Sequence, residues 1–333
     1  MQLKNSNPLV SISCLTFNHF FYIKECLDGF LMQKTTFPIE VILHDDCSTD
    51  GTREIIEEYS RKYPDIIFPM FQTENQYSKG IRGIMARFNF PRCSGKYIAL
   101  CEGDDYWTDP YKLQKQVDFL DKNEEYVLCF HKVGILKTDG IITEDFITKV
   151  PENYETINTL AKLGNYIHTP SVVFRNKFLK LPEEFTLAPF GDYFIYMILA
   201  QFGKLKYIED KMAVYRIGVG VWSTKDDFFR NFNTAYAHAL LTISFHKKEE
   251  ISTIFLQRII CFIDKYKSQL TPDHLDQLAV SSRVRKEIDA FFIKRINTLK
   301  KDRVQRKSLV VLFVIIMKRI KNIFFRNFKM IKI

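Results

Sequence analysis

Short apolar runs alternate with helix-like stretches between residues 9 and 133, and this alternation constrains the fold of the chain more than any other feature. The runs have the length of buried strands, and the stretches between them repeat apolar residues at three- and four-residue spacing. Strands that alternate with helices are typical of βαβ units and a mostly parallel sheet. The sequence therefore predicts an α/β fold with strands at Leu9–Leu15, Ile39–Leu43, Ile66–Phe71, Tyr97–Cys101 and Tyr126–Phe130.

Helices are expected between these strands, at Phe20–Gln33, at Thr52–Tyr63 and from Pro110 onward, where proline suits a first helical turn. The pattern is less regular after residue 133, with a strand expected at Ser171–Phe174, a helix at Asp192–Phe202 and a strand at Tyr207–Tyr215. After about residue 228 the spacing is helical. We predict an α/β domain at 1–225, a helical extension at 226–299 and a basic tail at 300–333.

The charge of the chain is concentrated at one end. Of the formal net charge of +9, residues 300–333 carry +10, because they contain eleven lysines and arginines against Asp302 alone. The other residues together carry −1, so a basic partner-binding surface is expected only in the tail. The uncharged stretch 308–317 is about half of the roughly twenty residues that a helix needs to cross a bilayer.

From Lys318 onward, helical spacing separates a basic side from an apolar side that contains Ile320, Phe324 and Phe328. Such a helix is typical of segments that lie on an anionic membrane. The alternative is a helix that packs on the rest of the protein and exposes its basic side to solvent. Nucleic acid is not expected as a partner, because the basic residues are interleaved with a continuous apolar face.

The seven cysteines form no CxxC pair and are widely spaced, which indicates reduced thiols of a cytoplasmic protein. The first ten residues lack a basic segment followed by a long apolar run, so no signal peptide is expected.

Adjacent carboxylates follow the fourth expected strand. Asp104 and Asp105 come directly after KYIALCEG, and such a pair at a strand end is costly unless a positive group neutralises it. Hard divalent cations take oxygen ligands, and magnesium usually takes one or two protein carboxylates together with substrate phosphates. The alternative is an ordinary solvated turn.

Two other polar segments should lie at the same edge of the parallel sheet as Asp104 and Asp105, because they also follow strand ends. They are the HDDCSTDGT run after the second strand and Thr16-Phe17-Asn18 after the first.

In order and spacing, VSISCLTFNH, HDDCSTDGT, GKYIALCEGDDYWTDPYKLQKQ and PFGDYF resemble family 2 glycosyltransferases with a GT-A fold, over about residues 8–225. The resemblance implies a Rossmann-like, mostly parallel sheet with flanking helices. It also implies that Thr16 and Asn18 contact the nucleotide and that Asp46 is the partner of the base.

Asp104 and Asp105 occupy the DxD-like position of the family. The resemblance implies that Asp104 touches the ribose or the metal and that Asp105 coordinates Mg²⁺ or Mn²⁺. Glu102 could replace the first carboxylate, because Glu102-Gly103-Asp104 also has an acid-x-acid spacing. Arg87 lies in the stretch before the fourth strand, where basic residues of similar enzymes approach the diphosphate. Lys79 and Arg82 lie in the same stretch. A solvated surface charge is the alternative for these three side chains.

Asp192, in the PFGDYF run, matches the general base of inverting members of the family. A carboxylate in this place can take the proton of a sugar hydroxyl as it attacks the anomeric carbon. Its alternative role is a helix N-cap, for which aspartate is well suited. His168 is interpreted as a packed, hydrogen-bonded histidine. Where many relatives have a histidine after the Tyr215-Arg216 pair, this chain has Ile217 and Gly218, so a fourth protein ligand from this segment is in doubt.

The resemblance as a whole implies an inverting glycosyltransferase of bacterial surface-polysaccharide assembly, such as O-antigen, capsule or exopolysaccharide. It would transfer a sugar from a nucleotide-sugar donor to a glycan or lipid-linked acceptor. With the tail on an anionic membrane, the expected location is cytoplasmic and peripheral on the inner face of the membrane. The alternative from another class is a noncatalytic membrane-surface protein that acts through the basic tail.

Overall fold

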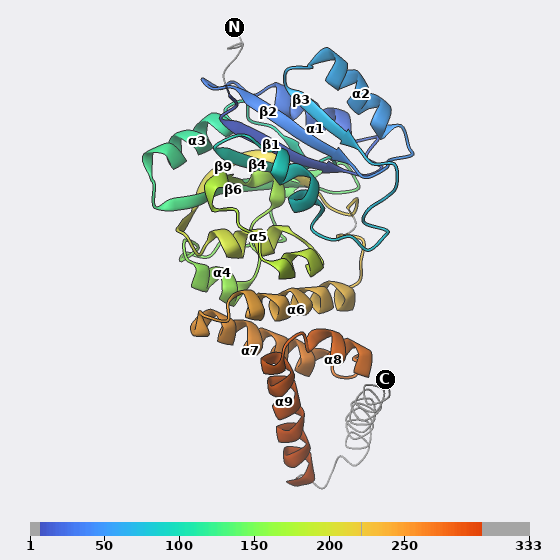
Figure 1. Cartoon of the computed structure of the whole chain (residues 1–333), viewed down its shortest axis with the longest axis vertical. Coiled ribbons are helices and arrows are strands. Elements are labelled where there is room, and N and C mark those ends of the chain that lie inside the picture. The colour runs from blue at the N-terminus through green and yellow to red at the C-terminus, as the bar shows by residue number, and fades with distance from the viewer. Residues whose placement is uncertain (1–6, 221, 302–333) are drawn as a thin grey trace, which may run out of the picture. The chain divides into compact units, whose positions relative to one another are not determined.

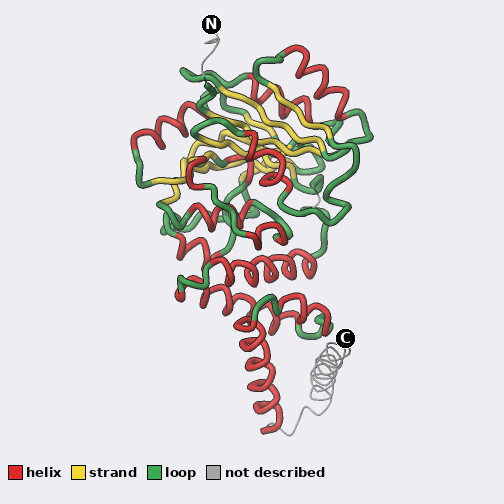
Figure 2. The backbone as a smooth tube through the Cα atoms, in the orientation of Figure 1, coloured by secondary structure: helices red, strands yellow, loops and turns green. Residues whose placement is uncertain are grey.

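The computed structural model describes residues 7–220 and 222–301 (Figure 1). The described residues form two compact units that divide between Lys225 and Asp226. Residues 302–333, which make up most of the predicted basic tail, lie outside the described residues. Strands occur in the first unit, whereas the described elements after residue 226 are helices joined by loops (Figure 2).

One mixed sheet forms the centre of the first unit. The described strands are ordered β3-β2-β1-β4-β8-β6-β9-β5, with β7 paired to β6. β1 (Val10–Thr16) pairs in parallel with both β2 (Ile39–Asp45) and β4 (Tyr97–Glu102), and β2 pairs in parallel with β3 (Ile67–Phe71). The carboxyl ends of these four strands therefore lie at one edge of the sheet. The sequence predicted the positions of the four strands closely.

The other half of the sheet contains antiparallel pairs. β8 (Val173–Arg175) runs antiparallel to both β4 and β6 (Tyr126–Leu136). β9 (Lys204–Arg216) is parallel to β6 and antiparallel to the short β5 (Tyr106–Trp107). β7 (Ile142–Glu144) forms a hairpin with the end of β6. Because β5 pairs with the end of β9, the residues just after Asp105 are held against Val214 and Ala213.

Helices flank the sheet where their apolar faces can be buried. α1 (Ile23–Leu31) buries Ile23, Cys26, Leu27 and Phe30, which lie on one side at three- and four-residue spacing. The remaining helices of the first unit are α2 (Thr52–Lys62), α3 (Lys112–Lys122), α4 (Ile157–Leu163) and α5 (Asp192–Leu199). α3 begins two residues after the Pro110 that was expected to open it.

The second unit contains α6 (Asp227–Ser244), α7 (Glu249–Tyr266), α8 (Pro272–Leu278) and α9 (Ser282–Lys301). Their facing sides form a separate core that includes Phe232, Ile259, Ile263, Leu275 and Ile288. The helical character expected after residue 228 is therefore confirmed for the described residues. None of the described helices is both long and apolar enough to cross a membrane.

Candidate active site

The loops after β1, β2 and β4 are tied to one another at the carboxyl edge of the sheet. Asp46 N donates to Thr16 O at 3.0 Å, and Gly103 N donates to Leu15 O at 2.8 Å. The three clusters that the sequence analysis selected therefore lie side by side. A glycine is needed after Glu102, because a Cβ on Gly103 would lie 2.9 Å from Thr16 Oγ1.

Asn18 fastens the β1 loop to the β2 loop. Its backbone has a φ of 55°, which is uncommon for a residue other than glycine but tolerated by asparagine. Asn18 N donates to Ser48 Oγ at 2.9 Å, and Asn18 Oδ1 accepts from Thr49 N at 2.9 Å. The side-chain carbonyl of this predicted nucleotide contact is thus already bound within the protein.

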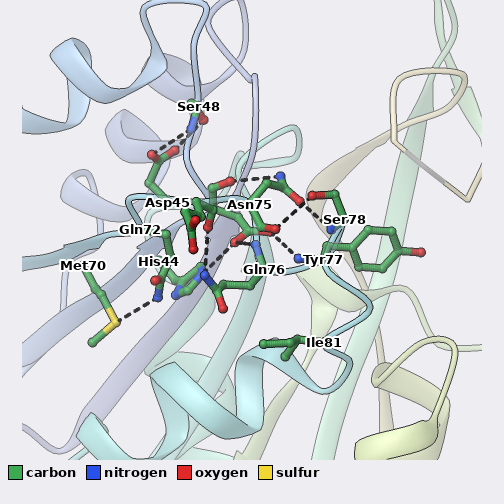
Figure 3. A network of polar contacts seen from close by, with 12 residues as sticks. His44, Asp45, Ser48, Met70, Gln72, Asn75, Gln76, Tyr77, Ser78 and Ile81 are labelled. Carbon is green, nitrogen blue, oxygen red and sulfur yellow. Dashed lines mark hydrogen bonds and ion pairs between the residues drawn. The ribbon is translucent and has the colours of Figure 1, made fainter.

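Asp46 holds the segment after β3. Its two carboxylate oxygens accept hydrogen bonds from Gln76 N at 2.8 Å and from Tyr77 N at 3.0 Å. Figure 3 shows Gln76 close to His44, whose Nε2 lies 3.6 Å from Asp46 Oδ1. Burial alone would raise the pKa of Asp46, but His44 and the two backbone N–H groups together lower it. Its predicted contact with the base remains a prediction.

Three carboxylates lie at the end of β4 and just after it. One oxygen each of Glu102, Asp104 and Asp105 lies within 4.8 Å of the others. Burial and the negative charges of Asp104 and Asp192 raise the pKa of Glu102 to about 8. Burial, followed by the charges of Asp104 and Glu102, also raises the pKa of Asp105 well above its ordinary value. Negative charge is therefore crowded at the position where the sequence predicted a cation.

The carboxylate oxygens of this cluster are suitable ligands for a divalent cation. Asp105 is 1% exposed, and its Oδ1 accepts from Arg216 N at 2.8 Å. Its Oδ2 is buried without a hydrogen-bond partner among the described residues, although a buried polar atom is normally paired. Carboxylate oxygens are the preferred ligands of Mg²⁺ and are also suitable for Mn²⁺. Residues Glu102, Asp104 and Asp105 could thus hold either ion.

Arg216 braces the carboxylate loop, a role that the sequence analysis missed. The Arg216 guanidinium, 6% exposed as a residue, donates to Asp104 O and forms an ion pair with Glu25 on α1. It lies 4.9 Å from the ring centre of Tyr22 and 4.6 Å from that of Tyr106. Its position at the end of β9 was the available signal, but its partners are far away in sequence.

Asp192 is brought to the same edge by α5. Gly191, and not Asp192, is the N-cap residue, and no side-chain cap hydrogen bond is present, so the capping alternative is wrong. Asp192 Oδ2 accepts a hydrogen bond from Asn165 Nδ2 at 2.8 Å. Burial raises the pKa of Asp192, and the Tyr193 N–H group and Asn165 partly oppose this effect. Because the Asp192 charge raises the pKa of Glu102, the two carboxylates lie within electrostatic reach of each other.

The three basic side chains predicted near the diphosphate differ in how far they already interact with other residues. Arg87 is exposed on the π-helical turn Met85–Asn89, and its Nε donates to Arg82 O at 3.1 Å. Lys79 is paired with Glu74, and the Arg82 guanidinium lies 4.2 Å from the ring centre of Tyr77. Arg87 remains the predicted diphosphate contact.

Two histidines border the site. The packed, hydrogen-bonded interpretation of His168 is confirmed, because its Nε2 lies 2.9 Å from Asp145 Oδ2 and its ring 4.9 Å from that of Tyr215. His19, which was not selected from the sequence, places its Nε2 4.0 Å from Asp104 Oδ2. Burial lowers the pKa of His19, and the nearby Asp104 charge opposes this effect.

Comparison with known proteins identifies the family of the chain. The family described as glycosyl transferase family 2 matches residues 11–181. An uncharacterized Mycobacterium tuberculosis protein is 36% identical over 236 residues, which cover 69% of this chain and 65% of the relative. TuaG of Bacillus subtilis, a putative teichuronic acid biosynthesis glycosyltransferase, is 31% identical over 145 residues, 44% of this chain and 54% of the relative. The chain thus spans somewhat less than two thirds of the length of the mycobacterial relative.

Solved structures support the fold. TarS 1-349 of S. aureus in complex with UDP-GlcNAc aligns with a TM-score of 0.53 and 17% identity, over 86% of this chain and 80% of that chain. The mannosyltransferase PcManGT of Pyrobaculum calidifontis, in complex with GDP-Man and Mn²⁺, aligns with a TM-score of 0.53 and 15% identity, over 95% and 88%. The family match covers half of the chain, and the structures share its architecture. The chain belongs to glycosyl transferase family 2 and has the GT-A fold.

Proposed function

We propose that this chain is an inverting, metal-dependent glycosyltransferase that transfers a sugar from a nucleotide-sugar donor to a glycan or lipid-linked acceptor. The observation that carries the proposal is the convergence of Asp192 with Glu102, Asp104 and Asp105 at one edge of the sheet. The catalytic residues are all assigned to the 1–225 domain. The name of TuaG, which refers to teichuronic acid biosynthesis, supports a surface polysaccharide as the product.

Asp192 has the chemistry of a general base. One of its oxygens accepts from Asn165, and the carboxylate has further lone pairs that can accept the proton of the acceptor hydroxyl. The bond to Asn165 also favours the charged form of Asp192 against its burial. Asn165 Oδ1 accepts from Ile167 N at 3.1 Å, so the amide group is oriented with its NH₂ toward Asp192. The acceptor oxygen then attacks the anomeric carbon as the bond from that carbon to the diphosphate oxygen of the donor breaks. This single displacement releases the nucleoside diphosphate and inverts the configuration of the carbon.

The donor is held on the other side of the reacting carbon. Thr16, Asn18, Asp46 and Asp104 are proposed to contact the nucleoside, and Arg87 the diphosphate. A bound Mg²⁺ or Mn²⁺ on the three carboxylates would neutralise the charge that develops on the leaving diphosphate. Arg216 keeps the carboxylate loop in place through Asp104 O and Asp105 Oδ1.

The acceptor is proposed to be met at an anionic membrane, through residues 300–333, on the cytoplasmic face. A transferase that acts on a lipid-linked glycan benefits from such a location, because its acceptor is confined to the bilayer surface. No nucleic acid partner is proposed.

A donor screen tests the activity. The full chain is incubated with a panel of nucleotide sugars and Mn²⁺, with and without lipid-linked acceptors, and release of the nucleotide is measured. We expect consumption of one donor, and a loss of at least about 100-fold in Asp105→Ala. Asp118→Asn, which changes an exposed carboxylate on α3, is the matched control and should keep full activity. If no donor is consumed, or if Asp105→Ala equals the wild type, the proposal is wrong.

A further inference from the structure

We propose that a cavity beside Asp192 binds a sugar residue of the acceptor glycan, next to the sugar whose hydroxyl reacts. This inference rests on the proposed function, because it concerns how the same enzyme holds its acceptor. The cavity has a volume of about 220 Å³. It lies between β6, β9, the loop after β7 and the segment that joins α4 to β8.

Aromatic rings form one wall of the cavity. Phe130 on β6 and Tyr207 on β9 are direct partners across the paired strands, and their ring centres are 5.2 Å apart. The ring centre of Tyr166 lies 6.1 Å from that of Phe130. Phe130 is buried, whereas Tyr207 is half-buried and lines the cavity. The face of an aromatic ring is apolar and electron-rich, so this wall can contact the C–H groups on one face of a sugar ring.

Polar side chains border the aromatic wall. His168 Nε2 lies 2.9 Å from Asp145 Oδ2, which also accepts from Thr148 Oγ1 at 2.6 Å, so these three side chains hold one another in place. Lys149 is exposed and also lines the cavity. Its ammonium group and the Tyr207 hydroxyl are of the kind that binds sugar hydroxyls. A mostly apolar cavity with a few polar groups at defined positions is typical of small-ligand sites.

One short segment connects the cavity to the proposed base. Asn165 donates to Asp192 and is followed directly by Tyr166, and both Tyr166 and His168 line the cavity. Three residues of extended chain span at most about 11 Å, so His168 lies close to the partner of the base. Burial raises the pKa of Asp192, and the charge that His168 can carry opposes this effect. The cavity is therefore near enough to hold a sugar that is linked to the reacting one.

A sugar residue fits this cavity better than a lipid chain does. Its volume of about 220 Å³ is below the range of roughly 300–1,000 Å³ that larger ligands occupy. A hydrocarbon chain would also cover the polar groups of Asp145, His168 and Lys149 without a hydrogen bond, which is costly. We therefore expect the enzyme to recognise two neighbouring sugars of its acceptor, the one that reacts and the one in the cavity.

Saturation-transfer NMR with the full chain tests the site without donor or metal. The probes are methyl glycosides of hexoses, N-acetylhexosamines and hexuronic acids. We expect at least one of them to bind, with a dissociation constant that rises at least about tenfold in Tyr207→Ala, because an aromatic wall is lost. Val150→Trp, which fills the cavity and keeps its aromatic wall, should have the same effect. Tyr207→Phe, which keeps the ring, should lose much less affinity.

Tyr111→Ala is the matched control, because Tyr111 is a 48% exposed tyrosine at the start of α3 and does not line the cavity. It should bind the glycosides as the wild type does. Thermal unfolding followed by circular dichroism shows which variants are folded, and Val150→Trp decides if Tyr207→Ala is not.

A wild type that binds none of the glycosides would overturn the assignment of the cavity. Folded Tyr207→Ala and Val150→Trp variants that bind them as tightly as the wild type would also overturn it. Binding of a short polyprenyl phosphate in place of the glycosides would assign the cavity to a lipid and contradict the proposal. Failure of the transferase itself is seen separately, as the absence of donor consumption in the screen described above.

Discussion

Buried charge at single residues governs how this protein should respond to pH. Lys112 on α3 is completely buried, and its ammonium group lies 2.8 Å from Gln116 Oε1 and 4.1 Å from the ring centre of Trp107. Burial lowers its pKa to about 7 from an ordinary 10.5. Between these two values the unfolded chain binds more protons at this residue than the folded chain does. The contribution of Lys112 to the free energy of unfolding therefore rises from pH 7 to pH 10.

Lys112→Met should remove this contribution while it keeps an unbranched side chain in the core. We expect the variant to be more stable than the wild type at pH 7, and the difference to shrink as pH rises to 10. The change in that difference should be a few kcal/mol at most, at about 1.36 kcal/mol per pKa unit. Urea unfolding at several pH values measures it, with exposed Lys122→Met on the same helix as the control. A difference that does not vary with pH contradicts a buried, shifted lysine.

At the scale of elements, the sequence predicted β1 to β4 and their flanking helices closely, because their periodic patterns are local. It ended β6 at Phe130, whereas the strand continues to Leu136. His131, Lys132 and Gly134 do not favour a strand by composition, and they are held there by pairing with β9. The two-residue β5 was missed for the same reason, since it exists through its pairing with β9.

The residues of the candidate site also divide into those that the sequence predicted and those that it did not. The carboxylates and Asp192 follow recognisable motifs at the ends of elements, so their residues could be selected from the sequence. Arg216, Asn165 and His19 act through partners that are distant in the chain, such as Glu25 for Arg216 at a separation of 191 residues. Their roles depend on tertiary contacts that no local pattern contains.

The conformation of the segment after β3 should depend on the Asp46 side chain. Asp46→Ala removes both acceptors of the Gln76 and Tyr77 N–H groups, and each lost hydrogen bond costs about 1 kcal/mol. We expect these two amides to exchange hydrogen at least about tenfold faster, as measured by NMR or mass spectrometry. Exposed Asp65→Ala, between α2 and β3, serves as the control. Unchanged exchange at residues 76 and 77 would show that Asp46 does not hold this segment.

For the whole molecule, the excess positive charge lies in a different part of the chain from the residues assigned to catalysis. The net charge of +9 is carried by residues 300–333, and the rest of the chain is close to neutral. The first unit has its own core and contains every residue assigned to catalysis. We therefore propose that membrane attachment and sugar transfer belong to different parts of the chain.

Removal of residues 302–333 should separate the two properties. We expect the shortened chain to lose binding to vesicles that contain anionic lipid, in a sedimentation assay, because those residues carry most of the basic side chains of the tail. Slow hydrolysis of the donor in solution should persist. Vesicle binding that survives the deletion would place the membrane contact elsewhere, and a full chain that binds vesicles but hydrolyses no donor would favour the noncatalytic alternative.

The most direct test of the central claim is the configuration of the product together with the role of Asp192. NMR of the transferred sugar gives its anomeric configuration, and Asp192→Asn removes the base while it nearly preserves the shape of the side chain. We expect an inverted anomeric centre and a kcat that is at least about 100-fold lower in Asp192→Asn. A retained configuration, or an Asp192→Asn variant as active as the wild type, would contradict the claim.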